Sequence, residues 1–323
     1  MHLPLWTILL LAVGRVAGAQ LVFESAGERA LGMAGAFVAV ADDATATHWN
    51  PAGLSIGGPA GMTIGTSRFQ NGDQKGLPKA GLLRRTGTLT SIGAWPLGVS
   101  YGHFQVTTLT GGEGQGDVVT AQTFRTSQYG VTILQTVLPG VVVGSTVKLL
   151  RGEALSEPAQ GGSAEAALKS GARLRGDRET ALDLDLGVMA TAARVRLGLT
   201  VKNLRSPKFG ELAAPNGLLP RQGRVGIAVI PANGLTLAMD VDLNTVDLMG
   251  GLRRMGAFGA EAALGSRLSA RSGIRWSLVG SRRPVGAVGL SLAVRRGLWL
   301  DGHYAKGRLD EDRELGVALR AGF

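Results

Sequence analysis

Residues 182–189 read LDLDLGVM and residues 195–202 read VRLGLTVK, so apolar side chains occupy every second position. A period of two is the signature of a β-strand with one apolar and one polar face. The same alternation returns in LTLAMDVDL at 235–243 and in LGVALRAGF at 315–323. Similar stretches lie near 61–69, 86–108, 120–152, 220–231, 255–278 and 284–305. Most of the chain after residue 60 is therefore expected to form strands.

The connections between these strands are of two kinds. Pro139-Gly140, Asn233-Gly234 and Arg296-Gly297 mark short turns, whereas polar stretches near 70–79, 109–119 and 153–178 are longer. The number of consecutive strands is larger than an ordinary β-sandwich contains. Short turns at one end and long loops at the other are typical of a membrane barrel. The pattern predicts an all-β fold, a closed antiparallel transmembrane β-barrel of about fourteen strands, with an error of two. The stretch 246–264 fits either one long strand or two.

Composition narrows the class of protein. The 323 residues include 50 Gly and no Cys, which excludes disulfides and thiolate sites. No run of about 18 apolar residues follows residue 20, so no later helix is expected to span a bilayer. The formal net charge is +10, but Lys and Arg are spread singly and no nucleic-acid-binding motif appears. We therefore expect basic residues at turns and in a polar lumen, and no nucleic-acid partner.

The two ends of the chain point to export and membrane insertion. An apolar run from Leu3 to Val13, followed by Ala17-Gly18-Ala19, predicts a signal peptide at 1–19. A membrane anchor is the alternative, but the run is too short to span. At the other end, Phe323 closes an alternating strand and is interpreted as the signal read by the barrel insertion machinery.

Residues 24–60 do not alternate. Asp42-Asp43 are predicted to cap a short helical turn through Ala46 and His48. Asn50-Pro51 then ends that turn, because a residue before Pro is pushed out of the helical region. Small residues dominate this segment, so it could pack tightly inside another part of the protein.

Several motifs carry a family resemblance. GERALGMAGA at 27–36, VADDA at 40–44 and WNPAGL at 49–54 resemble the amino-terminal hatch of the FadL/PorV superfamily of outer-membrane barrels. VKLL at 147–150, DLG at 185–187, GLTVKNL at 198–204, LPR at 219–221 and RAGF at 320–323 are also similar to that family. The hatch looks closer to the PorV/PorQ-like branch.

The resemblance implies a fourteen-stranded barrel at 61–323 whose lumen is filled by a hatch at 20–60. In FadL-type members the hatch gates uptake of long-chain fatty acids or other hydrophobic compounds, whereas PorV-type members serve protein secretion or surface attachment. The expected hatch residues are Arg29, Gly32, Gly35, Asp42, Asp43, His48, Trp49, Asn50 and Pro51.

The polar faces of the strands predict the lining of the lumen. Gly187, Gly198, Gly226, Gly289 and Gly316 either make room for the hatch or permit barrel curvature, and both interpretations stay open. Asp183 and Asp185 are expected on a strand that pairs with the one bearing Arg196 and Lys202, where opposite charges compensate. The predicted lumen-facing charged residues are Lys148, Asp183, Asp185, Arg196, Lys202, Arg224, Asp240, Asp242, Arg295 and Arg320.

No catalytic chemistry is predicted. Gly98-Val99-Ser100-Tyr101-Gly102 matches G-x-S-x-G, but it lies inside an alternating strand rather than at a strand-turn-helix junction. His2, His48, His103 and His303 lack metal-ligand spacing, so neither metal nor cofactor is expected.

The sequence thus predicts a bacterial outer-membrane channel for small hydrophobic or amphipathic compounds, gated by the hatch. The alternative is a PorV-like barrel that does not transport and serves secretion-system proteins. Membrane lipid is an expected partner in both cases.

Overall fold

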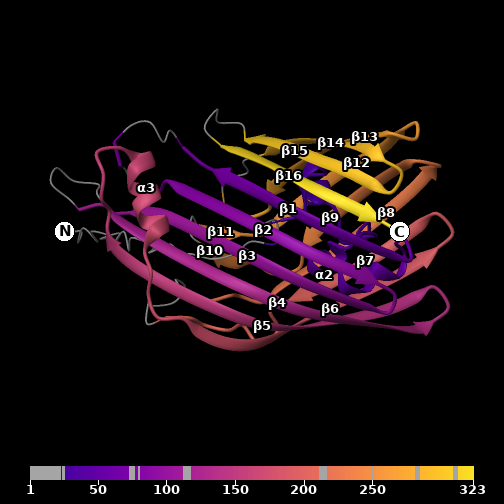
Figure 1. Cartoon of the computed structure of the whole chain (residues 1–323), viewed down its shortest axis with the longest axis horizontal. Coiled ribbons are helices and arrows are strands. Elements are labelled where there is room, and N and C mark those ends of the chain that lie inside the picture. Colours follow the sequence, from indigo (N-terminus) through magenta and orange to yellow (C-terminus); the bar gives the residue numbers. More distant parts are fainter. Residues whose placement is uncertain are drawn as a thin grey trace, which may run out of the picture.

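The computed structural model describes residues 23, 26–72, 77–78, 81–111, 118–210, 217–248, 251–280, 284–307 and 312–323. Fourteen strands close into one antiparallel barrel, in which β1 pairs with β16 (Figure 1). The expected fold class and strand number are confirmed. The barrel strands are β1 (Ala60–Gln70), β2 (Leu83–Ala94), β3 (Leu97–Thr110), β4 (Thr120–Leu138), β5 (Val141–Pro158), β6 (Glu179–Ala192), β7 (Val195–Lys202), β8 (Gln222–Ala232), β9 (Leu235–Asp242), β12 (Met255–Leu264), β13 (Leu268–Ser277), β14 (Val285–Arg295), β15 (Leu298–Gly307) and β16 (Arg313–Gly322).

The barrel has a short-turn end and a long-loop end. Tight turns such as Ala94–Leu97 and Leu138–Val141 lie on the right of Figure 1, together with the C-terminus. Helix α3 (Ala164–Arg173) lies at the opposite end. The stretch 246–264 contributes only β12 to the barrel. It begins with a separate hairpin of β10 (Val246–Leu248) and β11 (Gly251–Arg253).

The outer face carries an apolar belt. On β4 the exposed apolar side chains run from Tyr129 to Leu138, which matches the ~9–11 residues that a tilted strand needs to cross a bilayer. Tyr129 lies opposite Tyr101 of β3, with ring centroids 5.1 Å apart. Paired tyrosines at the edge of an apolar belt are typical of a membrane–water interface. Among the described helices, none has the length and apolar character needed to cross a membrane.

Helix α3 covers the outside of the barrel beyond this tyrosine pair. Leu168 packs with Leu109 of β3 and Ala121 of β4. Thr123 donates from Oγ1 to the Gly171 carbonyl at 2.9 Å. The strands that extend past the belt are thus shielded by protein instead of lipid.

The N-terminal segment lies inside the barrel, near its short-turn end (Figure 1). It forms α1 (Glu28–Gly32), α2 (Ala46–Trp49) and the 3-10 helix η1 (Pro51–Ser55). The residue that precedes α2 is Thr45, and Asp43 Oδ1 accepts the Thr45 N–H at 2.9 Å. Asp43 therefore stabilises the turn that leads into α2, and the expected capping of the helix by the Asp42-Asp43 pair is wrong. The predicted signal peptide at 1–19 lies outside the described residues.

Candidate functional site

Close approach of the hatch explains three of the five predicted luminal glycines. A Cβ added to Gly187 would lie 2.2 Å from Asn50 Oδ1, one on Gly198 would lie 2.4 Å from the Val38 carbonyl oxygen, and one on Gly289 would lie 3.0 Å from Gly32 Cα. A Cβ on Gly226 would lie 2.3 Å from Asp240 Oδ1 of β9 and 3.2 Å from the Ala39 backbone nitrogen, so barrel and hatch both crowd it. Gly316 differs, because its neighbour is the His303 ring at 2.6 Å.

Arg29 of α1 joins the hatch to the barrel. Its guanidinium pairs with Asp42 and lies 3.1 Å from Asp43, both within the hatch. It also donates two bonds of 2.8 Å to the carboxylate of Glu261 on β12. Fork-like pairing of this kind fixes orientation as well as position.

Further ionic contacts lie beside Arg29 and Glu261 on the neighbouring strands of the barrel. Arg271 of β13 pairs with Glu261 and donates to Ser291 of β14 at 2.6 Å. Arg320 of β16 donates to Asp301 of β15 at 2.9 Å. We call this inward face of β12–β16 the ionic wall, which comprises Glu261, Arg271, Arg275, Ser291, Asp301, Glu314 and Arg320.

Two further predicted residues hold the middle of the hatch. Asp240 of β9 accepts the backbone N–H groups of Phe37 and Val38, each at 2.9 Å. Arg224 of β8 donates to Asp242 at 2.7 Å and to the Gly35 carbonyl at 3.3 Å. Gly35 has a φ of 89°, a left-handed conformation that glycine adopts readily.

The end of the hatch is fixed by its own polar side chains. Asn50 Nδ2 donates to the carbonyls of Val38 at 2.9 Å and of Val188 on β6 at 3.1 Å. The buried Trp49 donates from Nε1 to the Ala26 carbonyl at 3.0 Å. Pro51 opens η1 and lies against Gly187.

The expected charge compensation between β6 and β7 takes another form. The two strands do pair, with Leu186 opposite Val201. However, Asp183 and Asp185 bind Lys148 of β5, at 3.2 and 2.7 Å. The β7 residues turn to the hatch instead: Arg196 lies 3.6 Å from Asp42, and Lys202 Nζ lies 3.1 Å from His48 Nε2.

Arg295 is not in the lumen. It is the last residue of β14, beyond a register shift at Ala293/Arg295, and its side chain is exposed. The bulge breaks the alternation from which its inward position was predicted. Phe323 follows β16, is 80% exposed, and donates its N–H to the Ala60 carbonyl at 3.0 Å.

Part of the inward face of β2–β6, beside the Lys148 cluster, is apolar, which the sequence prediction of a polar lumen missed. Phe209, from the connection after β7, lies in this cluster with its ring 6.2 Å from Phe124. Towards the hatch, the Phe104 ring lies 5.6 Å from His48. We call this face the apolar wall, which comprises Leu83, Leu89, Phe104, Val106, Phe124, Leu150, Ala154 and Ala181. Phe104 and Phe124 share the inward parity of their strands, so register alone could have identified them.

Burial and charge set the titration of the hatch residues. Burial raises the pKa of Glu28 to about 8, and the charges of Asp301, Asp43 and Glu314 add to this. Its Oε1 accepts no hydrogen bond from the described residues. Burial opposes the ionisation of Asp43, but the charges of Arg29 and Arg320 and the hydrogen bonds from Thr45 and Arg29 together outweigh it and lower the Asp43 pKa. The hatch therefore contains one ion-paired acid cluster and one isolated buried acid.

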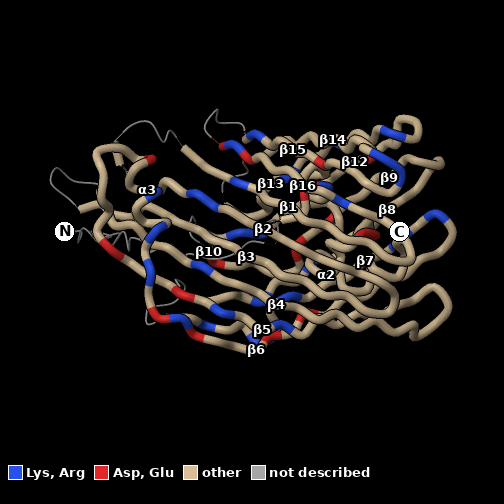
Figure 2. The backbone as a smooth tube through the Cα atoms, in the orientation of Figure 1, with Lys and Arg blue, Asp and Glu red and all other residues tan. Residues whose placement is uncertain are grey.

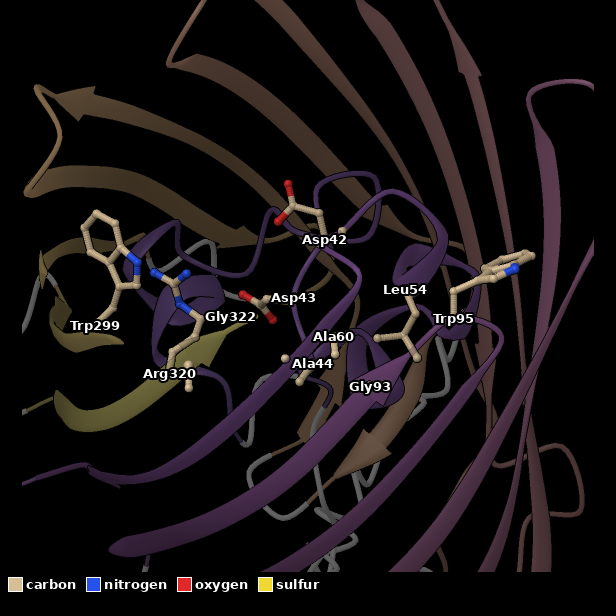
Figure 3. A pocket seen from close by; sticks show the side chains of 14 residues that line it. Asp42, Asp43, Ala44, Leu54, Ala60, Gly93, Trp95, Trp299, Arg320 and Gly322 are labelled. Carbon is tan, nitrogen blue, oxygen red and sulfur yellow. The ribbon is translucent and has the colours of Figure 1, made fainter. Parts of the chain in front are cut away.

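Water-sized space remains at the short-turn mouth. A cavity of about 120 Å³ lies between Asp42 and Asp43 of the hatch, Arg320 of β16, and Trp95 (Figure 3). A second cavity of about 310 Å³ adjoins Arg29 and Arg271. The ionic contacts of the hatch are thus the part that solvent reaches first.

Ser100 of the G-x-S-x-G motif lies within β3 and points at Gly130 of β4. The strand-turn-helix setting of a nucleophile elbow is not formed at this position. In the described part of the chain, no group of three or more His, Asp or Glu side chains is arranged to hold a metal ion.

The geometry defines a membrane-type β-barrel with an internal N-terminal hatch. Solved structures with this fold include the CymD monoaromatic hydrocarbon channel, with a TM-score of 0.65 and 12% identity over 92% of this chain and 97% of that one. The Ralstonia pickettii toluene transporter TbuX has a TM-score of 0.64 and 15% identity, covering 94% and 100%. A Pseudomonas aeruginosa FadL homologue has a TM-score of 0.63 and 11% identity, covering 94% and 99%.

These similarities show that the chain has the fold of FadL-type outer-membrane barrels. A family model described as the F plasmid transfer operon TraF protein matches residues 118–242, which is less than half of the chain. No curated protein matches the sequence.

Proposed function

We propose that this chain is an outer-membrane channel for small hydrophobic or amphipathic compounds, and that the hatch at 20–60 is its gate. The observation that supports this function is the apolar wall, which leads from Phe209 at the long-loop end to His48 of the hatch. The lumen of a membrane barrel is normally polar. An apolar strip inside it favours an apolar guest over water or ions.

The structural neighbours support the same class of cargo. Two of them are described as a monoaromatic hydrocarbon channel and a toluene transporter. In our proposal residues 1–19 are removed on export, residues 61–323 form the barrel, and Phe323 is read by the insertion machinery. The short-turn end then faces the periplasm, as in other barrels of this kind.

The gating role is tested by deleting residues 24–55. The barrel strands begin at Ala60, so the deletion leaves every strand intact. We expect conductance in a planar bilayer to rise from near zero to that of an open pore, together with faster uptake of apolar compounds by cells. Unchanged conductance of a correctly folded deletion variant would show that the hatch is not the barrier.

A PorV-like scaffold is the second candidate, and the dense packing of the hatch favours it. Trp49 is fully buried, and Arg29 contacts three carboxylates, which suits a fixed filler. Copurification with large secretion subunits, combined with normal uptake in cells that lack the chain, would support the scaffold. An uptake defect without such copurification supports the channel.

A further inference from the structure

The barrel wall is incomplete between β6 and β7 at the long-loop end. Their pairing runs from Ala192–Val195 to Leu186–Val201. The first part of β6, Glu179–Asp185, is paired on its β5 side. Among the described strands, none pairs with its other side, where a backbone hydrogen bond runs from the Leu204 N–H to the Leu184 carbonyl at 3.0 Å.

The chain after β7 bends inward at this gap. Asp185 Oδ1 accepts the Asn203 N–H at 2.8 Å, and Asp183 Oδ1 accepts the Arg205 N–H at 3.0 Å. A Cβ added to Gly152 of β5 would lie 2.4 Å from the Phe209 ring, so that ring lies flat on the inner wall. The segment 203–209 thus crosses from the wall into the lumen and leaves its outer side open.

A cavity of about 640 Å³ lies on this outer side. Its floor is apolar, with Leu149 37% and Leu182 55% exposed on facing positions of β5 and β6. Its rim is basic, with Arg205 and Lys208 both exposed. Arg151 lies opposite Thr180, which also lines the cavity.

The register places this cavity at the edge of the apolar belt. Tyr101 lies opposite Tyr129, Tyr129 opposite Leu149, and Leu149 opposite Leu182. On β5 and β6 themselves, Leu149 and Leu182 are the last exposed apolar residues before the long-loop end. Arg151 and Thr180 follow them as exposed polar residues, so the apolar belt ends here.

The basic rim has no internal counter-charge. Within the described residues, Arg151, Arg205 and Lys208 make no ion pair with an acidic side chain. Glu179 lies at the start of β6, but it accepts the Gly210 N–H at 3.1 Å. Figure 2 shows Lys and Arg residues interspersed with Asp and Glu along the long-loop half of β4–β6. An anionic group from outside the protein would compensate this charge.

We propose that this lateral cavity binds a membrane lipid of the outer leaflet whose phosphorylated head group carries a net negative charge. The phosphate contacts Arg205 and Lys208, and one acyl chain lies on Leu149 and Leu182. Guanidinium matches the geometry of phosphate oxygens, and Lys adds a second positive charge. The cavity opens on the lipid-facing side, so lipid binding there can be measured separately from transport through the lumen.

The test measures lipid binding to the full chain in detergent by native mass spectrometry. The probes are phosphatidylglycerol and phosphatidylcholine with the same acyl chains. We expect the anionic lipid to bind at least about tenfold more tightly. The double substitution Arg205→Gln with Lys208→Gln is expected to weaken phosphatidylglycerol binding about tenfold to thirtyfold, since each basic residue near an anionic lipid contributes a similar factor to the affinity.

The matched control is Arg295→Gln with Arg296→Gln, which removes the same charge from exposed positions at the short-turn end. That variant should bind phosphatidylglycerol like the wild type. Leu182→Ser, on the floor of the cavity, should weaken the binding of phosphatidylglycerol without affecting the barrel fold. Equal loss in both double variants, equal binding of the two lipids, or displacement of the lipid by inorganic phosphate at equal concentration would each overturn the proposal.

Discussion

The two sides of the lumen differ in chemistry. On β2–β6 the apolar wall presents side chains such as Phe104, Phe124 and Leu150. On β12–β16 the ionic wall presents Glu261 and Arg271 among others. The hatch lies between them, with His48 against the Phe104 ring of the apolar wall and Arg29 paired with Glu261 of the ionic wall.

This difference assigns the two walls different roles, because one positions the hatch and the other offers a path for a hydrophobic guest. Ion pairs are directional, so the contact of Arg29 with Glu261 defines where the hatch lies against the ionic wall. Apolar contacts are non-directional and allow one apolar group to replace another. We therefore expect a hydrophobic guest to pass along the apolar wall while the ionic wall retains the hatch.

Removing the central cation should have the largest effect. In Arg29→Ala, the carboxylates of Asp42, Asp43 and Glu261 lose their shared partner. Removing one partner of a buried ion pair costs about 3–5 kcal/mol. The lower end is expected here, because Arg271 still pairs with Glu261 and Arg196 lies 3.6 Å from Asp42. We expect the hatch to loosen, which faster limited proteolysis and frequent channel openings would show.

Arg296→Ala removes a charge from an exposed turn and serves as the control. If Arg29→Ala is as resistant to protease as this control, then the ionic wall does not retain the hatch.

The apolar wall is tested by Phe209→Ala. The Phe209 ring is fully buried against Gly152, and its loss should destabilise the barrel by about 3 kcal/mol, the lower end for such truncations. The vacated space should bind benzene, whose size matches the removed ring, and benzene should raise the Tm of the variant. Phe258→Ala makes the same change on the lipid face, where Phe258 is 45% exposed, and benzene should leave its Tm unchanged. The same response in both variants would contradict a luminal apolar site.

Strand alternation sufficed to predict the barrel, because period two places Leu182 outward and Asp183 inward without tertiary information. It also placed Asp240 and Arg224 correctly among the buried inward residues. It failed at Arg295, where a bulge shifts the register. The partner of Asp183 was missed too, because alternation gives the face of a residue but not which neighbouring strand supplies its counter-charge. The inward position of Phe209 could not be predicted from alternation, since the inward bend at 203–209 depends on where β7 ends.

Gly289→Ala probes the close approach of α1 to the ionic wall. The added methyl would lie 3.0 Å from the Gly32 Cα, so the helix must shift. Overpacking of this kind costs about 1–3 kcal/mol. On the same strand, Gly286→Ala has no atom within 4 Å of the new methyl and should be neutral. Equal Tm values for the two variants would show that α1 does not press on β14.

The last effect depends on pH and concerns Glu28, which has no basic partner among the described residues and packs against Gly65 of β1. Its pKa is about 8 in the packed hatch and 4.5 in its ordinary state. The packed state therefore holds the proton more tightly. Hatch packing should be strongest below pH 4.5 and weaken as pH rises to about 8, with a slope of at most ~1.4 kcal/mol per pH unit.

Glu28→Gln should remove this slope, because the amide cannot ionise in the buried site. The measurement is the protease resistance of the hatch between pH 5 and 9. Glu165→Gln, on the exposed face of α3 where Glu165 pairs with Lys169 at 2.9 Å, should leave the profile of the wild type unchanged. A wild-type profile as flat as that of Glu28→Gln would mean that the Glu28 carboxyl reaches water in the packed hatch. The contacts of the hatch with the ionic wall, with Asp240 and with Arg224 would then determine how firmly it is held.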